Sequence, residues 1–310
     1  MTINVAIAGA TGHLGPYVVR AFLEPSIHPL QVKRVVAFTR NATSDSAKDL
    51  ETRGAEVIEG APTVQDLKGI DVFINVLSDK VSVDVRDTYA QAAAEAGVKV
   101  YFPNEFVADA RLLDFEHPLY KMKLAHAKRA RELGSGKMKV VSVYSGQFLD
   151  YLFWGGAMIG LDTVNRTYTV SVLPANKFGI TSMADVGTAL ARFSILAAEN
   201  PASVPDHVRL SADAVSFAEL ATVVGNERGE TIEVKSTICK RCLSSIAAFT
   251  RSNGDADITE FHPDRCLFTT FSTFLLSRSP TVLASYRRSL RDIKVVDVIL
   301  TLENEMSDKA

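Results

Sequence analysis

Three glycines, Gly9, Gly12 and Gly15, directly follow the apolar run of residues 3–8 and precede a helical pattern at residues 16–24. The run 3–8 is short, apolar and rich in β-branched residues, which predicts a buried strand. A strand, a glycine-rich turn and a helix in this order bring backbone N–H groups and the positive end of the helix dipole to a pyrophosphate. The order therefore predicts a dinucleotide site. Its predicted contacts are Gly9, Thr11, Gly12, His13, Leu14 and Gly15. The alternative is that the glycines serve only a turn and that His13 is solvated.

The alternation of strands and helices continues through the first half of the chain. It predicts an α/β fold with a parallel, doubly wound sheet of the Rossmann type. Further strands are expected at residues 34–40, 55–61, 71–78 and 98–106, with a helix at 84–97. Ligands of such sheets bind at the carboxyl ends of the strands. The candidate contacts at these ends are Asn75, Leu77, Pro103, Asn104, Glu105 and Phe106.

The end of the second predicted strand bears on the choice of cofactor. A site that prefers NAD has Asp or Glu there to bond the ribose 2′-hydroxyl. This chain has Thr39 and Arg40 instead, and Lys48 follows. A cation at this position suits a 2′-phosphate, which favours NADP(H) over NAD. The alternative is that Arg40 is a solvated loop residue.

A candidate for proton transfer lies on the predicted helix at residues 117–133. None of the eight tyrosines has a lysine four residues later, so the Tyr-x-x-x-Lys pair of ordinary short-chain dehydrogenases is absent. Helical spacing puts Lys123 on one face with Ala127 and Ala130, whereas Lys121 and Lys128 lie on another face that we expect to be solvated. A lysine beside apolar surface and a bound dinucleotide has a lowered pKa and can exchange a proton. The alternative is a surface helix with surplus charge.

Several segments together resemble one family. These are GATGHLG at residues 9–15, FPNEF at 102–106, YKMKLAHAKRARELG at 120–134, VVSVYSGQFLDYLF at 140–153 and ITSMADVGTALARF at 180–193. The combination resembles the NmrA-like and isoflavone-reductase-like branch of the atypical short-chain dehydrogenases, whose glycine spacing is also G-x-x-G-x-x-G. The family usually reads Pro-Ser-Glu-Phe-Gly after the fifth strand, where this chain has Asn104 and Val107 in place of the Ser and the Gly.

The resemblance implies two classes of function. The first is an NADPH-dependent reductase of an aromatic or secondary-metabolite-like small molecule. In the family's reductases an essential lysine matches Lys123, and the phenylalanine that shapes the nicotinamide pocket matches Phe148. The second is a non-catalytic NADP(H)-sensing regulator, and a redox-neutral enzyme on the same fold is a further option. Lys123 favours the enzyme, and the altered PNEFV segment favours the other two.

The expected organisation is an NADP-binding Rossmann domain at residues 1–150 and a substrate-binding part at residues 151–310 that packs on it and is not cleanly separable. The resemblance extends to about residue 235. Beyond about residue 238 the sequence matches nothing in the family, so the substrate stays open.

Composition excludes several other classes. A formal net charge of −2 gives no reason to expect direct contact with nucleic acid. No apolar stretch is long enough to span a bilayer, and the amino terminus lacks the pattern of a secretory signal. The Cys239–Cys242 pair, with His262 and Cys266 downstream, is weak evidence for zinc, so no metal is expected. The sequence thus predicts a cytoplasmic protein with a small-molecule substrate, and a homodimer is compatible with it.

Overall fold

The computed structural model describes residues 2–27, 31–112, 117–153, 161–162, 166–170, 175 and 177–236. The four candidate zinc ligands and the region beyond about residue 238 lie outside these residues. The chain divides into two compact units. Unit 1 comprises the described residues of 1–113, 119–145 and 183–210, and unit 2 comprises the others.

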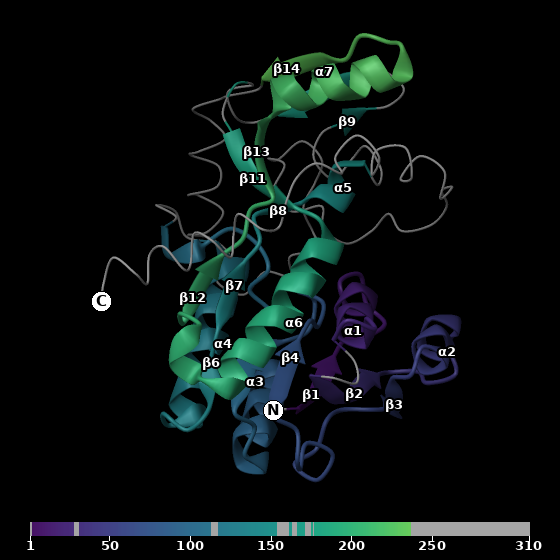
Figure 1. Cartoon of the computed structure of the whole chain (residues 1–310). Helices are drawn as coiled ribbons and strands as arrows, with labels where there is room; N and C mark the ends of the chain where they lie inside the picture. Colours follow the sequence, from purple (N-terminus) through teal and green to yellow (C-terminus); the bar gives the residue numbers. More distant parts are fainter. Residues whose placement is uncertain are drawn as a thin grey trace. The chain divides into compact units, whose positions relative to one another are not determined.

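A six-stranded parallel sheet forms the centre of unit 1, with the strand order β3-β2-β1-β4-β5-β6 (Figure 1). This order, in which the second half of the sheet starts beside the first strand, is that of the doubly wound Rossmann fold and confirms the predicted fold class. The strands are β1 (Ile3–Ala8), β2 (Val32–Thr39), β3 (Glu56–Glu59), β4 (Val72–Asn75), β5 (Val100–Phe102) and β6 (Lys139–Val140).

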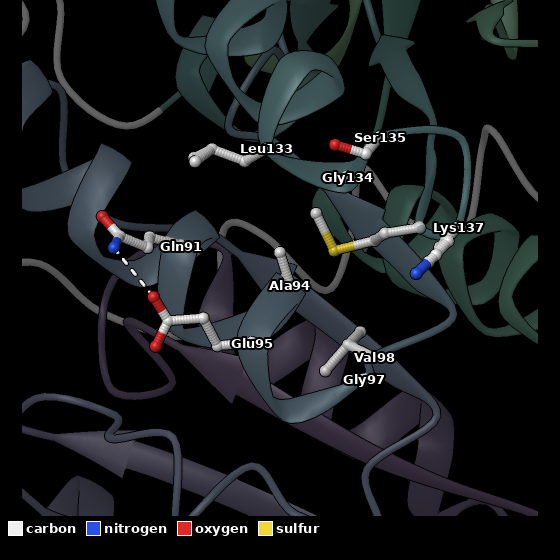
Figure 2. Close-up of a pocket in the computed structure, with 10 residues that line it drawn as sticks. Gln91, Ala94, Glu95, Gly97, Val98, Leu133, Gly134, Ser135 and Lys137 are labelled. Atoms are coloured by element: carbon white, nitrogen blue, oxygen red, sulfur yellow. Dashed lines mark hydrogen bonds between the residues drawn. The ribbon is translucent and has the colours of Figure 1, made fainter.

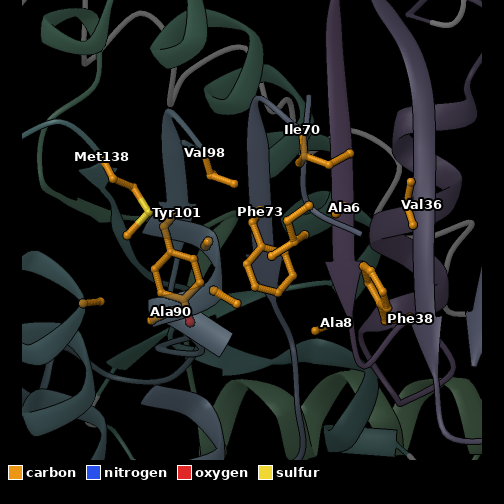
Figure 3. Packing of buried hydrophobic residues seen from close by; sticks show 14 of the residues in the cluster. Ala6, Ala8, Val36, Phe38, Ile70, Phe73, Ala90, Val98, Tyr101 and Met138 are labelled. Carbon is orange, nitrogen blue, oxygen red and sulfur yellow. The ribbon is translucent and has the colours of Figure 1, made fainter. Parts of the chain in front are cut away.

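Helices of unit 1 cover both faces of this sheet. Side chains of one strand alternate between the faces. Ala6 and Ala8 of β1 belong to a cluster with Phe73 and Tyr101 of the neighbouring strands and with alanines of α3 and α4 (Figure 3). Helices α1 and α6 contact each other and strands of the sheet. The helices are α1 (Gly15–Leu23), α2 (Asp45–Thr52), α3 (Val83–Ala96), α4 (Pro118–Gly134) and α6 (Met183–Glu199), with the 3₁₀ turns η1 (Ala110–Leu112) and η2 (Pro201–Ser203).

Two strands are shorter than the sequence suggests. The segment predicted as strand 98–106 is paired only over β5, which ends immediately before Pro103. Proline has no N–H to donate to a neighbouring strand, so pairing stops there. The segment predicted as strand 71–78 ends at Asn75. As a result the residues after β4 and β5 form loops at the carboxyl edge of the sheet.

A second strand pair extends unit 1. Strand β7 (Ser142–Tyr144) follows β6 after Val141 and pairs in parallel with β12 (His207–Arg209). Helix α6 also belongs to unit 1, although it lies beyond residue 150.

Unit 2 contains two small sheets with the orders β14-β10-β9 and β13-β11-β8. Helix α7 begins with a capping box between Ser216 and Glu219, in which each side chain bonds the backbone N–H of the other residue. The elements are β8 (Gln147–Phe148), α5 (Leu149–Phe153), β9 (Leu161–Asp162), β10 (Thr167–Val170), β11 (Lys177–Thr181), β13 (Asp213–Ser216), α7 (Phe217–Arg228) and β14 (Glu233–Ser236). Among the helices of the described segments, none is both long and apolar enough to cross a membrane.

Candidate active site

The first and third glycines of the loop after β1 are required by the fold itself. Gly9 has φ +83°, and a Cβ there would lie 2.7 Å from the Val76 carbonyl oxygen. A Cβ on Gly15 would collide with the carbonyl oxygens of Gly9 and Ala10. Gly9 therefore lets the loop approach Val76 just after β4, and Gly15 lets the start of α1 pack against the loop.

The middle of the loop is different. Gly12 and His13 are exposed, and a Cβ on Gly12 would meet one neighbouring atom only, the Gly9 carbonyl oxygen at 3.1 Å. Thr11 Oγ1 lies 2.9 Å from Thr39 Oγ1 and fastens the loop to the end of β2. Leu14 is the N-cap of α1 and makes no side-chain cap hydrogen bond. The loop thus presents an open backbone at a helix amino terminus, which fits a pyrophosphate.

Arg40 and Lys48 follow β2 in positions open to solvent. Arg40 directly follows the last residue of the strand and makes no ion pair with any described residue. Thr39, which stands where an NAD site would have a carboxylate, is buried and bonded to Thr11. Ser44 caps α2 by accepting the Ala47 N–H, and Lys48 lies exposed on that helix. The two cations fit a 2′-phosphate. The Glu59 carboxylate at the end of β3 lies at the same edge and accepts the Ala42 N–H at 2.8 Å.

Asn75, at the end of β4, is fully buried and bonded within the protein. Its Oδ1 accepts the Leu77 N–H at 3.1 Å, so its Nδ2 donates to the Tyr101 hydroxyl at 3.0 Å. That hydroxyl is hydrogen-bonded to His126 Nε2 at 2.9 Å, and His126 Nδ1 donates to the Asp87 carboxylate at 2.6 Å. Burial lowers the pKa of His126, against the opposing charge of Asp87, which favours the neutral ring. Asn75 therefore positions the loop after β4 through its hydrogen bond with the Leu77 N–H.

Lys123 is the buried cation of the site. It is 2% exposed and lies on α4 with Ala127 and Ala130 buried beside it, while Lys121 and Lys128 are exposed. The predicted division of the helix into faces is confirmed. Its Nζ donates to the Asn104 carbonyl oxygen at 2.8 Å and forms an ion pair of 2.8 Å with Asp79 Oδ1. Burial lowers the pKa of Lys123, and Asp79 opposes that shift.

Asp79 brings three groups together in the loop after β4. Its Oδ1 also lies 3.3 Å from Asn104 Nδ2 and 3.5 Å from Arg86 Nη2. The Arg86 guanidinium, 1% exposed, donates in addition to the carbonyl oxygens of Ser78 and Val81. Asn104 Nδ2 donates to the Leu77 carbonyl as well. The Asp79 carboxylate and the Lys123 ammonium therefore join three elements: the loop after β4, the loop after β5 and helix α4.

Glu105 is buried beside these charges without a hydrogen-bond partner. It is 1% exposed, and neither carboxylate oxygen has a partner among the described residues. Burial raises its pKa to about 7, against the opposing charges of Lys123, Arg131 and Arg86. Its neighbours Pro103 and Phe106 are also buried, so this part of the loop points into the protein.

A second charged group lies at the carboxyl end of β7. The buried Asp109 accepts from Arg111 and from Arg209 Nε at 2.9 Å. Burial alone would raise its pKa, but these hydrogen bonds lower it to about 2. The Arg111 guanidinium lies 5.3 Å from the centre of the Tyr144 ring, and the Tyr144 hydroxyl lies 3.0 Å from His207 Nδ1. These residues add charge and aromatic surface to the same edge of the sheet.

Phe148 belongs to unit 2. It is buried on β8, and its ring contacts Tyr151 edge-on with centroids 5.5 Å apart. Its predicted place beside a nicotinamide stays a prediction.

A groove of about 350 Å³ lies at the other end of unit 1 (Figure 2). Ala94 and Glu95 of α3 and Leu133 of α4 line it. Gly97, just after α3, and Lys137 and Met138, just after α4, complete the lining. Glu95 accepts a hydrogen bond of 2.8 Å from Gln91 there. Within the described part of the chain no cluster of His, Cys, Asp and Glu could hold a metal ion.

A family comparison identifies the chain. The model of the NmrA-like family matches residues 1–262. The chain belongs to the NmrA-like family. No curated protein sequence matches it.

Solved structures similar to this NmrA-like chain include reductases and a regulator. An isoflavone reductase has a TM-score of 0.63 and 21% identity, with 84% of this chain and 83% of that chain covered. An NADPH-dependent quinone oxidoreductase from Escherichia coli, complexed with NADPH, has a TM-score of 0.59 and 21% identity, with 80% and 83% covered. NmrA, a negative transcriptional regulator in complex with NADP, has a TM-score of 0.62 and 14% identity, with 76% and 74% covered. These likenesses support the Rossmann fold.

The NmrA-like chain has site residues that its sequence did not reveal. Asp79, Arg86, Asp87 and Tyr101 come from separate loops, helices and strands, and only the folded sheet brings them near Lys123 or His126. The one sequence signal that could have indicated Asp79 is its position shortly after a predicted strand.

Proposed function

We propose that this protein is an NADPH-dependent reductase of an aromatic or secondary-metabolite-like small molecule. The observation that carries the proposal is a buried lysine, Lys123, at the carboxyl edge of a sheet whose first loop has an exposed glycine, Gly12. Ligands of doubly wound sheets bind at this edge. The NADPH-dependent members among the similar structures support the same conclusion.

The residues of the chain suit NADP(H) in two places. Gly12 and the amino terminus of α1 would hold the pyrophosphate, and Arg40 with Lys48 would meet the 2′-phosphate. When bound, the cofactor supplies a hydride. The predicted contacts of the nicotinamide half stay proposals, and they are Asn75, Leu77, Pro103, Asn104, Glu105, Phe106 and Phe148. Of these, Leu77 and Asn104 are half-buried and the others are buried.

Lys123 would handle the proton of the reaction at its Nζ. A reduced carbonyl or enone needs one proton in addition to the hydride, and an ammonium group can donate it to the substrate oxygen. Burial, which lowers the pKa of Lys123, makes that ammonium a better acid than a surface lysine.

The test is NADPH oxidation with a panel of enones, quinones and phenolic compounds. Lys123→Met keeps the length and apolar stem of the side chain and should lower turnover by about 10² or more, the scale of a positioned acid. Binding of NADPH should change only a few-fold. Lys121→Ala, on the exposed face of the same helix, is the matched control and should leave turnover unchanged.

A non-catalytic NADP(H) sensor is the second candidate. The ammonium of Lys123 already has partners in Asp79 and Asn104, as a purely structural lysine would have. NADPH binding without turnover of any compound in the panel favours this candidate.

We further propose a substrate-binding part built from residues 151–310, a small-molecule substrate and a cytoplasmic location. A homodimer stays compatible with the sequence.

A further inference from the structure

A lysine as deeply buried as Lys123 needs a counter-charge to stay an ammonium, because burial favours the neutral amine. The charged groups around it come from several elements. They are Asp79 after β4, Arg86 on α3, Glu105 after β5 and His126 on the same helix. Arg86 is a second buried cation, and His126 is bonded as a neutral ring, so neither can supply negative charge.

Two carboxyl groups, those of Glu105 and Asp79, could supply the negative charge, and they differ in burial and in contact with Nζ. Glu105 is buried without a hydrogen bond, and its raised pKa of about 7 leaves it partly neutral at physiological pH. Asp79 is 27% exposed at its side chain, so water stabilises its charge, and it contacts Nζ directly at 2.8 Å. Asp79 is therefore the carboxylate that contacts the buried ammonium directly, and it is the counter-ion of Lys123.

The position of Asp79 also fixes where the ammonium lies. The same Oδ1 that meets Nζ lies 3.3 Å from the amide of Asn104, whose carbonyl oxygen accepts from Nζ as well. Nζ is thus held between the loops that end β4 and β5.

We propose that Asp79 is the positioning residue of Lys123: it keeps Nζ protonated at the carboxyl edge of the sheet and aims it between the two loops. This inference rests on the proposed function, because Asp79 would hold the ammonium group whose proton the reductase transfers. Asp79 itself need not touch the substrate.

The proposal predicts a direction for the titration of Lys123. Burial and Arg86 lower the pKa of Lys123, whereas Asp79 raises it. Removing the Asp79 charge should therefore lower that pKa further, by about 1–3 units for a partner at this range. The amine then loses its proton at a lower pH, and the alkaline limb of turnover moves to lower pH by the same amount.

The first measurement needs no substrate. Protein with ¹³C,¹⁵N-labelled lysine is titrated by NMR, and the Lys123 signal is assigned by its loss in Lys123→Met. In the wild type the signal should be that of an ammonium at pH 7. Asp79→Asn should lower the midpoint by about 1–3 units, and Asp79→Glu should restore most of the shift. A neutral Lys123 in the wild type at pH 7 overturns the proposal even if Asp79→Asn does not fold.

The control variant is Asp71→Asn. Asp71 pairs with Lys99 at 2.7 Å at the opposite edge of the same strands, so this change removes an Asp–Lys pair without approaching Lys123. It should leave the Lys123 midpoint where it is. Equal midpoints in wild type and folded Asp79→Asn overturn the proposal.

The second measurement is the pH profile of NADPH oxidation with any active compound from the panel. Asp79→Asn should lower kcat on the alkaline side only, with KM little changed, and Asp79→Glu should recover it. A loss that is equal at all pH values would indicate mere loosening of the loop and contradict the proposal. If wild type shows no turnover while Lys123 titrates as expected, the reductase fails but the pairing of Asp79 with Lys123 stands.

Discussion

Strands β4 and β5 have an aspartate–lysine pair near each end, and the two pairs have different surroundings. At the amino edge, Asp71 precedes β4 and pairs with Lys99, which precedes β5, at 2.7 Å; the Lys99 side chain is 49% exposed. At the carboxyl edge, Asp79 pairs with Lys123 at 2.8 Å, and the Lys123 side chain is 1% exposed. The two distances are nearly the same, so distance does not distinguish the pairs.

Burial is what distinguishes them. At the amino edge Asp71 is itself 16% exposed and also accepts the Asn4 N–H at 2.9 Å, but its partner Lys99 is half-exposed. Water can replace the contact of Lys99, and an ion pair with such an exposed lysine contributes about 0–1 kcal/mol to stability. At the carboxyl edge Lys123, Arg86 and Glu105 are all withdrawn from water, and Asp79 alone among the four keeps partial exposure. Charges buried together in this way are costly to keep and shift their pKa values, which is typical of functional sites.

The largest difference between the edges should appear when each aspartate is neutralised. Asp79→Asn leaves a fully buried lysine without its counter-ion, which should lower the free energy of unfolding by up to about 3–5 kcal/mol. Asp71→Asn should lower it by about 1 kcal/mol or less. Urea unfolding of both variants at neutral pH measures the difference. Equal losses of unfolding free energy in the two variants would mean that burial does not distinguish the two ion pairs.

The stability of the protein should depend on pH through Glu105. Its pKa is raised in the folded protein from 4.5 to about 7, so its favourable contribution is complete below about pH 4.5 and is lost as the pH rises through 7. The loss amounts to up to about 3 kcal/mol. Glu105→Gln should remove this decline and make the protein more stable than wild type above pH 7.

Glu95→Gln provides the control for that change. Glu95 is exposed in the groove at the amino edge, so its replacement should leave the pH dependence of unfolding unaltered. Thermal unfolding of the three proteins between pH 5 and about 8.5 covers the window. A decline that persists in Glu105→Gln would assign it to another group.

The smallest effect expected here concerns the choice of cofactor. Arg40→Ala removes a charge-assisted contact of about 1.5–3 kcal/mol, so NADP(H) should bind roughly tenfold more weakly or worse. NAD(H) should bind as before, because it has no 2′-phosphate. Parallel calorimetric titrations with the two cofactors distinguish the cases. Equal weakening of both would mean that Arg40 does not contact that phosphate.

The features predicted correctly from sequence are those that depend on local order. The glycine loop follows from the spacing of Gly9, Gly12 and Gly15, and the buried face of α4 follows from the helical period that unites Lys123 with Ala127 and Ala130. Each of these signals lies within one strand, turn or helix. The parallel, doubly wound sheet follows from the alternation of strands and helices.

The features that sequence did not predict depend on distant elements meeting. Asp79 lies in a short loop with no period to reveal its direction, and its partners are on α3, α4 and the loop after β5. The same is true of the bonds from Asp87 to Asn75 through His126 and Tyr101. The burial of Glu105 was also hidden, because a charged residue after a strand is expected to be exposed.

The most direct test of the account is whether the carboxyl edge binds the dinucleotide. Calorimetric titration with NADPH should show binding to the wild type and to Asp71→Asn with equal affinity. Gly12→Val should fold, since a Cβ there meets only the Gly9 carbonyl oxygen, at 3.1 Å, but its side chain would fill the space of the pyrophosphate. Its affinity should fall by about 100-fold or more, equivalent to about 2.7 kcal/mol. Unchanged affinity in folded Gly12→Val, or no binding by the wild type, would contradict the account.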